Sequence, residues 1–345
     1  MADGGEKERR SINLALQGGG THGAFTWGVL DRLLEDERIA IEAISGTSAG
    51  AINAAVLAQG HLKSGASGAR AALDRFWHRL SELGWMSPVH RGWYERAMGS
   101  WNIDESPSAI FVDQLSLLVS PYQSNPLNLS PLRDLLGSML DWQALTAPAA
   151  IKLFITATNV RTGKPRIFER LELSLDALLA SACLPQVFQA VVIEGEPYWD
   201  GGYMGNPSLW PLIYNSRSHD ILLVQINPLT REGVPHTAAE ITNRLNEITF
   251  NASLMREMRA IAFAERLIEA DGKHPAVARL KRMLIHMIEA EEAMEALGVA
   301  SKMNTDLDFL LYLKELGRRT ADRWLEKNFA ALNRYSSLDI RKIFL

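Results

Sequence analysis

Ser48 lies at the centre of a short motif whose residue types could perform nucleophilic chemistry. Residues 46–50, Gly-Thr-Ser-Ala-Gly, fit Gly-x-Ser-x-Gly, which places a serine on a sharp turn between a strand and a helix. The mostly apolar residues 39–44 predict the strand, and the small residues 51–58 predict the helix. Small neighbours let the two elements approach closely and expose the Ser48 hydroxyl. The alternative is an ordinary glycine-rich turn capped by Ser48.

A glycine-rich loop is the second candidate element. Residues 11–16 predict a first strand, and Gly18, Gly19 and Gly20 follow it, just before a segment with helical apolar spacing. Consecutive glycines leave backbone N–H groups unobstructed, and the start of a helix adds a favourable dipole. Such a loop suits a phosphate or the oxyanion of an acyl-transfer intermediate. The alternative is a turn that binds no ligand.

The same glycines also fit a dinucleotide site. Gly18, Gly20 and Gly23 match Gly-x-Gly-x-x-Gly after a strand. That fingerprint also requires an acidic residue at the end of the second strand, where this chain has the serine turn. Glu42 lies in the middle of that strand. The oxyanion interpretation is therefore favoured, and a non-catalytic nucleotide- or anion-binding protein stays as an alternative.

A third motif, Asp200-Gly201-Gly202, follows residues 191–199, which predict a β-hairpin. Alone, this tripeptide indicates only a turn. Together with residues 18–23, 46–50 and 180–188, however, it resembles the patatin-like phospholipases in order and spacing. The resemblance covers roughly residues 11–228.

The resemblance implies a Ser–Asp dyad without a catalytic histidine, in which Ser48 is the nucleophile and Asp200 the base. It also implies an oxyanion hole and a set of supporting residues. The implied oxyanion hole consists of Gly18, Gly19, Gly20 and Thr21. The implied supporting residues are Gly46, Gly50, Gly201, Gly202 and His22.

The chain departs from the family pattern directly after the glycine run. The family often has Arg or Lys there, whereas this chain has Thr21 and His22. A titratable group therefore replaces a fixed positive charge. His22 could assist the oxyanion when protonated, but packing or a structural hydrogen bond is the favoured interpretation.

A conventional triad would need a histidine after Asp200. His219 precedes the strand predicted over residues 221–226, so in a parallel sheet it falls at the edge opposite Ser48. His236 follows that strand on the same side as Ser48. A surface-loop position is favoured for His236, and a triad that includes it stays as an alternative.

Composition indicates an ordinary globular chain without nucleic-acid binding. Its 345 residues are 47% hydrophobic and 22% charged, with a net charge of −4 and no basic stripe. Residues 1–10 are polar, and no run of about 18 apolar residues occurs. We therefore expect a disordered tail, a cytoplasmic location and at most peripheral contact with a membrane. The single Cys183 and the absence of His-Glu-x-x-His predict neither a metal nor another cofactor.

The elements that must position these residues predict a three-layer α/β/α fold with a mainly parallel central sheet. The catalytic domain is expected over residues 11–235, with a strand at 221–226 closing the sheet. Within it, residues 61–150 predict a tryptophan-rich helical insertion, and its segment 77–101 could cover the site or simply fill the core. This segment contains Trp77, Trp85, Trp93 and Trp101. Residues 236–345 predict a C-terminal helical appendage with helices near 237–270, 276–297 and 306–329.

These motifs together predict a serine acyl hydrolase that cleaves carboxylic esters of lipids. The substrate class implied by the resemblance is that of a phospholipase A or lysophospholipase. A non-lipid serine esterase, including one that acts on polyesters, is the alternative within the same chemistry.

Overall fold

The protein is built on one eight-stranded sheet that is parallel at its centre. The computed structural model describes residues 9–86, 101–104, 106 and 118–345. The strand order is β5-β6-β3-β2-β1-β7-β8, and β4 pairs with β3. The parallel strands are β1 (Arg10–Leu16), β2 (Ile39–Thr47), β3 (Lys152–Asn159), β7 (Asp220–Val224) and β8 (Leu284–Ile288). The antiparallel strands are β4 (Pro165–Glu169), β5 (Val191–Ile193) and β6 (Glu196–Asp200).

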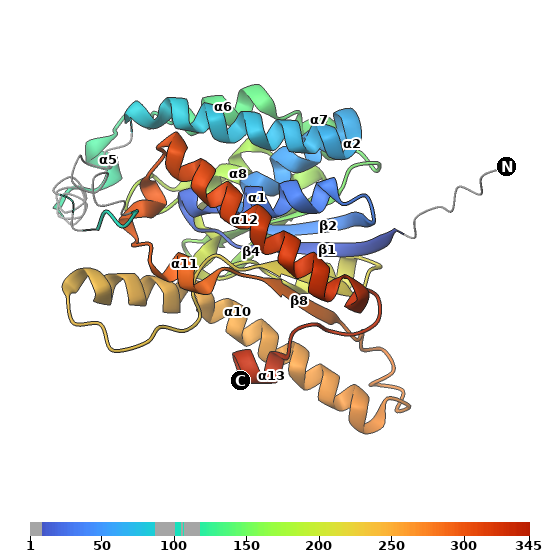
Figure 1. Ribbon diagram of the computed structural model, residues 1–345. Helices are drawn as coiled ribbons and strands as arrows, with labels where there is room; N and C mark the ends of the chain where they lie inside the picture. Colours follow the sequence, from blue (N-terminus) through green and yellow to red (C-terminus); the bar gives the residue numbers. More distant parts are fainter. Residues whose placement is uncertain (1–8, 87–100, 105, 107–117) are drawn as a thin grey trace.

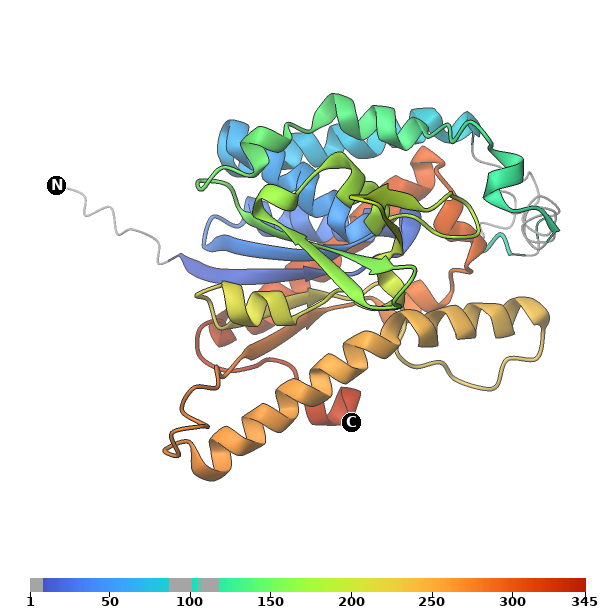
Figure 2. The ribbon, with the colours of Figure 1, turned by 180° about the vertical axis from the view of Figure 1, so that it is seen from behind.

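Helices cover both faces of this sheet, as expected for parallel strands with apolar residues on both sides. Figure 1 shows α1 (Gly23–Glu35), α2 (Ala49–Glu82) and α12 (Leu307–Asn328) on one face, with α10 (Ala238–Asp271) and α13 (Ile340–Phe344) on the other. The reverse view in Figure 2 shows the same layers. Leu14 and Leu16 join the core under the first group, whereas Ala15 joins the core under the second. The predicted three-layer α/β/α class is confirmed.

Smaller helices complete the two layers. These are α5 (Pro121–Ser124), α6 (Pro131–Met139), α7 (Trp142–Leu145), α8 (Leu175–Ser181), α9 (Trp210–Asn215) and α11 (Glu291–Glu295). Short 3-10 turns, among them η1 (Gly20–His22), η4 (Gly201–Tyr203) and η5 (Ala300–Met303), lie beside the motifs identified above. The long helix α2 starts at the serine turn and is interrupted at Ser64 and Gly65, where the backbone is not helical.

The C-terminal region is helical in α10 and α12, but one predicted helix is wrong. Residues 284–288, Leu-Ile-His-Met-Ile, form β8, which pairs with β7 and extends the sheet beyond the strand expected to close it. A short apolar run cannot be assigned to a strand or a helix by periodicity alone. Residues 284–288 form a strand because they pair with the edge of β7.

Helix α12 packs so closely on α1 that the C-terminal region is part of the core. A Cβ atom on Gly28 of α1 would overlap the Lys314 carbonyl, and one on Gly317 of α12 would overlap the Phe25 carbonyl. Phe309, Leu313 and neighbouring apolar residues of α12 are buried in the same core as the apolar residues of α1. The expected C-terminal helical region is therefore present, and its helix α12 forms part of the layer that covers one face of the sheet.

Replacing Gly317 with Ala is expected to destabilise the protein without changing the residues near Ser48. The added methyl group meets backbone atoms of α1, which cannot rotate away, and overpacking of this kind costs about 1–3 kcal/mol. Thermal unfolding followed by circular dichroism would measure the loss. Ala substitution at Gly137 of α6, whose Cβ would meet only Leu175 Cδ2 at an ordinary 3.5 Å, is the control for the packing term. Equal Tm values for Gly317→Ala and wild type would contradict this account of the helix pair.

The tryptophans of the predicted cover do not share one environment. Trp77 is buried in the core, where its ring stacks on Trp27 with 6.1 Å between centroids. Trp101 is half-buried and stacks on Tyr312 at 5.3 Å. Trp93 and the side chain of Trp85 lie outside the described residues. Trp77 therefore fills the core, as one of the two alternatives expected. That the rest of segment 77–101 covers the site stays a prediction.

Candidate active site

Ser48 occupies a strained turn between β2 and α2. Its φ of 53° and ψ of −124° are rare for a residue with a side chain, and such strain is typical of functional sites. The Ser48 amide donates a 2.9 Å hydrogen bond to Ser181 Oγ. A Cβ atom on Gly50 would overlap the Leu16 carbonyl, so the small residue there lets β1 and α2 approach. The turn predicted from the sequence is present.

The glycine loop lies directly against this serine. A Cβ atom built on Gly18 would come 2.6 Å from Ser48 Cβ, so only glycine permits the approach. The Gly18 amide donates a 2.7 Å hydrogen bond to Asn206 Oδ1. Among the described residues, no acceptor is recorded for the amides of Gly19 and Gly20. The Gly18 amide is therefore already hydrogen-bonded within the protein, unlike the next two amides of the loop.

Asp200 ends β6 as a fully buried carboxyl group. Its amide donates to the Cys183 carbonyl at 2.7 Å, and its Oδ1 accepts a 2.7 Å bond from the Gly202 amide. Its Oδ2 is buried and has no hydrogen-bond partner among the described residues. The carboxyl group is thus held at one oxygen and free at the other.

Burial raises the pKa of Asp200 to about 7. The Gly202 amide, the Ser48 hydroxyl and the positive charge of Lys302 act in the opposite direction and lower this pKa. No hydrogen bond of ordinary geometry joins Ser48 to Asp200, yet the hydroxyl is near enough to affect the carboxyl group. A pKa near neutrality suits a group that accepts and returns a proton.

His22 is a buried, neutral hydrogen-bond donor. Burial, followed by the charge of Lys302, holds the pKa of its imidazole well below the ordinary value. Its Nε2 lies 2.7 Å from Ser301 Oγ, and that hydroxyl donates its one proton to the Gly298 carbonyl. His22 Nε2 must therefore carry a proton and donate it to Ser301. This geometry corresponds to the structural hydrogen bond favoured from the sequence.

Four buried carboxamides position the glycine loop, and the sequence analysis missed all of them. Gln17 Oε1 accepts from the amides of Ile226 and Asn227, each at 2.9 Å. Gln17 Nε2 donates to Asn251 Oδ1 at 3.1 Å, while Asn227 Nδ2 donates to the Gly18 carbonyl at 3.0 Å. Gln17 directly follows the end of β1, and Asn227 lies shortly after the end of β7. Polar residues at the ends of neighbouring parallel strands were a signal that the sequence offered. Asn206 and Asn251 carry no such signal.

Lys302 is a second residue that the sequence did not reveal. It belongs to η5, and its carbonyl packs against Gly20, where a Cβ atom would overlap it. Its Nζ donates a 2.8 Å hydrogen bond to Asn227 Oδ1. Burial lowers the pKa of this ammonium group to about 8. The C-terminal region therefore brings a cationic side chain to the glycine loop.

The histidines considered for a triad do not join Ser48 and Asp200. His219 lies at the start of β7 and binds the Arg282 carbonyl through Nδ1 at 2.6 Å. His236 is exposed, and its amide donates to Glu240 Oε2 at 2.7 Å. Neither imidazole has a hydrogen bond to Ser48 or Asp200 within the described part of the chain.

A separate Ser–His–Asp grouping occurs away from the motifs. His286 of β8 is buried, with Nε2 2.9 Å from Asp220 Oδ1 and Nδ1 2.9 Å from Ser337 Oγ. The Ser337 amide also points at Nδ1, at 3.3 Å, and the Asn333 amide donates to Asp220 Oδ1. These bonds attach the C-terminal segment to β7 and β8.

The part of the chain that the structure describes shows no sign of metal chemistry. It contains no group of three or more His, Cys, Asp or Glu side chains arranged to hold a metal ion. No helix within those ranges is both long and apolar enough to cross a membrane. Burial raises the pKa of Cys183 to about 12, so its thiol stays protonated.

Comparison with known proteins identifies the family. The family model for patatin-like phospholipases matches residues 14–213, more than half of the chain. No curated protein sequence matches the chain. The match begins within β1 and includes the glycine loop, the Ser48 turn and Asp200, which are the elements described above. The chain belongs to the patatin-like phospholipase family, whose members are lipid ester hydrolases.

Two solved structures are similar to the chain at low identity. VipD from Legionella pneumophila has 16% identity and a TM-score of 0.36, with 89% of this chain and 67% of that chain covered. A complex of ExoU and SpcU from Pseudomonas aeruginosa gives 15% identity and a TM-score of 0.34, with 94% of this chain covered. This chain spans 53%, about half, of the matched chain in that complex.

Proposed function

We propose that the protein hydrolyses carboxylic esters of lipids, with Ser48 as the nucleophile and Asp200 as the base. The observation that carries this proposal is the meeting of three elements at the carboxyl ends of β1 and β2. They are the strained Ser48 turn, the glycine loop in contact with it, and a buried carboxyl group with an unpaired oxygen. Family membership supports the same reaction class.

The proposed reaction has two halves. Ser48 Oγ attacks the ester carbonyl, Asp200 Oδ2 accepts the hydroxyl proton, and the alcohol leaves with that proton as the acyl-enzyme forms. Asp200 then removes a proton from water, which attacks the acyl carbon. As the bond between that carbon and Ser48 Oγ breaks, Asp200 returns the proton to Oγ, and the fatty acid leaves. Because the Gly18 amide is bonded to Asn206, we assign the oxyanion to the amides of Gly19, Gly20 and Thr21.

The substrate subtype is part of the proposal, with phospholipase A or lysophospholipase activity as the expected form. A panel of phospholipids, lysophospholipids, acylglycerols and short polyesters, with products identified by mass spectrometry, tests it. Release of fatty acid from the phospholipids supports the lipid substrate. Hydrolysis of the short polyester alone would favour the non-lipid esterase. Failure of a fluorophosphonate to label the protein would favour a non-catalytic anion-binding protein.

Peripheral contact with a lipid surface is proposed through the start of α10. Ile241, Leu245 and Ile248 follow one face of this helix at intervals of four and three residues, with 44%, 60% and 51% of their surfaces exposed. Both ribbon views show this part of α10 extending away from the sheet (Figures 1 and 2). An exposed apolar face of this kind suits insertion at the boundary of a bilayer.

Replacing Ile241, Leu245 and Ile248 together with Ser is expected to weaken binding to phosphatidylcholine vesicles at least about tenfold, because roughly 1.5–3 kcal/mol is available from each buried side chain. Vesicle sedimentation measures the effect. Phe263→Ser, at another exposed apolar position on the same helix, is the control. Hydrolysis of a soluble short-chain ester should stay at the wild-type rate. Unchanged vesicle binding by the triple variant would exclude this surface.

A further inference from the structure

Lys302 places an ammonium group beside the glycine loop without a carboxylate partner of its own. Its recorded hydrogen bond goes to the neutral Asn227 carboxamide, and no ion pair joins it to any described residue. Its backbone carbonyl packs against Gly20, and its Nζ lies 5.8 Å from the ring centre of Phe250. The Phe250 ring in turn lies against Gly202, the residue that binds Asp200. Lys302 thus lies between the glycine loop and the Asp200 turn.

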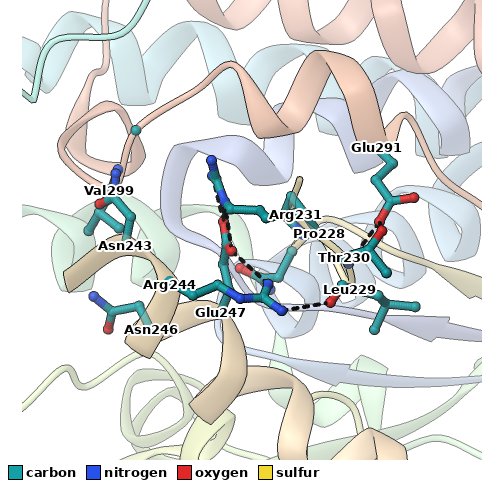
Figure 3. A network of polar contacts seen from close by, with 12 residues as sticks. Pro228, Leu229, Thr230, Arg231, Asn243, Arg244, Asn246, Glu247, Glu291 and Val299 are labelled. Carbon is teal, nitrogen blue, oxygen red and sulfur yellow. Dashed lines mark hydrogen bonds and ion pairs between the residues drawn. The ribbon is translucent and has the colours of Figure 1, made fainter. Parts of the chain in front are cut away.

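The acidic groups around Lys302 are mostly committed to other partners. Glu247 of α10 accepts three hydrogen bonds from the Arg231 guanidinium and a fourth from that of Arg244. Figure 3 shows this network. Asp104 accepts from Asn243 Nδ2 at 2.6 Å and from the Ala300 amide at 2.8 Å. Among the carboxylates that act on Lys302, Asp200 alone has a buried, unpaired oxygen.

The loop after the glycines contributes no charge of its own. Thr21 donates its hydroxyl proton to the Ser301 carbonyl at 2.8 Å, and neutral His22 binds the Ser301 hydroxyl. Both side chains therefore fasten the residue that precedes Lys302. Thr21 and His22 carry no fixed positive charge themselves. They hold the segment that carries the ammonium group of Lys302.

We propose that Lys302 supplies, from the C-terminal region, the positive charge that the glycine loop lacks, and that it positions Asp200 as an ionised base. The inference rests on the proposed function, because it assigns Asp200 the role of base. Lys302 acts through Asp200 and through Asn227, so it is a positioning residue.

Two contacts give this lysine a defined place. Asn227 accepts from Lys302 Nζ at its Oδ1 and donates from Nδ2 to the Gly18 carbonyl, which links the ammonium group to the loop. The segment before Lys302 is fixed by Asn243, whose Oδ1 accepts from the Val299 amide at 3.2 Å. Figure 3 shows Asn243 on the same turn of α10 as the Arg244 and Glu247 network.

The charges that face the pair determine the sign of the expected pH effect. Lys302 is faced by Asp200, Glu247 and Asp104, which favour its charged form, and by Arg231, which opposes it. Asp200 is faced by Lys302 and by the neutral groups of Ser48, Cys183 and Tyr203. Removing the ammonium charge therefore raises the pKa of Asp200, and a smaller fraction of the carboxyl group is ionised at pH 6 to 7.

The test compares Lys302→Met and Lys302→Arg with wild type in full pH profiles of kcat/KM. The acidic limb of Lys302→Met is expected to move up by about one pH unit, within the range for loss of a nearby opposite charge. At pH 6 such a shift lowers kcat/KM about tenfold, since the ionised fraction falls by that factor. Lys302→Arg should return the acidic limb to its wild-type pH. The recovery should appear mainly in kcat, with a smaller change in KM.

Two further variants separate charge from folding. Lys302→Gln can still donate to Asn227 Oδ1, so it replaces Lys302→Met if that variant does not fold, and it should show the same shift. Lys281→Met removes a partly buried lysine that binds the Ser216 and Ser218 carbonyls near the start of β7, and it should leave the limb unchanged. The rate of fluorophosphonate labelling against pH gives the same information without a lipid substrate.

An acidic limb that stays at the wild-type pH in Lys302→Met and Lys302→Gln would overturn the inference, even if both variants lose thermal stability. Such a result, with Ser48→Ala inactive and unlabelled, would leave the proposed function intact. Hydrolysis that persists in Ser48→Ala would instead overturn the proposed function and the inference with it. A shift that Lys302→Arg fails to reverse would show a structural effect and would also overturn it.

Discussion

Replacing Ser48 with Ala is expected to abolish ester hydrolysis and labelling by a fluorophosphonate. The Ser48 hydroxyl is the atom assigned to form the acyl-enzyme, and loss of a nucleophile lowers kcat by roughly 10³-fold or more. Ala has no hydroxyl to substitute for it. Initial rates on the preferred phospholipid and mass spectrometry of the labelled protein measure the two effects.

The fold should survive this substitution, because the Ser48 amide, and not its side chain, bonds to Ser181. Circular dichroism and thermal unfolding provide the control. Ser181→Ala is a matched variant that removes the bond to that amide and keeps the nucleophile, so it should retain labelling. Residual turnover by Ser48→Ala above about 1% of the wild-type rate would place the chemistry on another residue.

Replacing Asp200 with Asn is expected to lower kcat by about 10²–10⁴-fold, the range for loss of a general base. The amide cannot accept the Ser48 proton, although its oxygen can still receive the Gly202 amide bond. In the wild-type enzyme, activity should rise with pH through the region near 7, where the Asp200 carboxyl group ionises. A pH profile of kcat/KM measures this limb, which should disappear in the variant.

His236→Ala is the matched control for the base, and its kcat should change less than about tenfold, below the loss expected for a general base. His236 is exposed and forms no hydrogen bond with Asp200. If His236→Ala were as inactive as Ser48→Ala, a triad would replace the dyad.

The stability of Asp200→Asn gives a second readout with a definite sign. The native carboxyl group has a pKa of about 7, above its ordinary value of 3.8, so the folded state binds more protons between these pH values. Wild-type stability therefore falls as the pH rises from about 4 to 7, because ionisation of the buried group costs free energy. The stability of Asp200→Asn should not fall in this way. As the pH rises over that interval, its Tm should therefore increase relative to that of wild type.

Local sequence was sufficient for the Ser48 turn, the glycine loop and the Asp200 turn. Each is a short motif whose glycines serve a nearby backbone contact: Gly18 meets Ser48, Gly50 meets Leu16, and Gly202 binds Asp200. Such contacts form where strands end, so residue spacing along the chain predicts them. The alternation of predicted strands and helices around these motifs was likewise sufficient for the parallel sheet.

Contacts between distant segments were decided by the tertiary structure. Residues 284–288 became β8 because the edge of β7 was free to pair, and their apolar run alone fits a helix equally well. Helix α12 became a core layer because Gly28 and Gly317 allow it to touch α1. No periodicity in the sequence indicates which helix will find which partner.

The electrostatics of the site also depended on residues far apart in the chain. Asn206 and Ser301 reach the glycine loop from segments about 190 and 280 residues away, as the hydrogen bonds of Gly18 and Thr21 show. The next residue, Lys302, packs its carbonyl against Gly20. Burial by the surrounding layers raises the pKa of Asp200 and holds that of His22 down. The sequence by itself therefore predicted which groups are candidates to react. Only the folded structure decided the direction of their pKa shifts and brought Lys302 to the glycine loop, because desolvation and charge proximity arise when the layers pack.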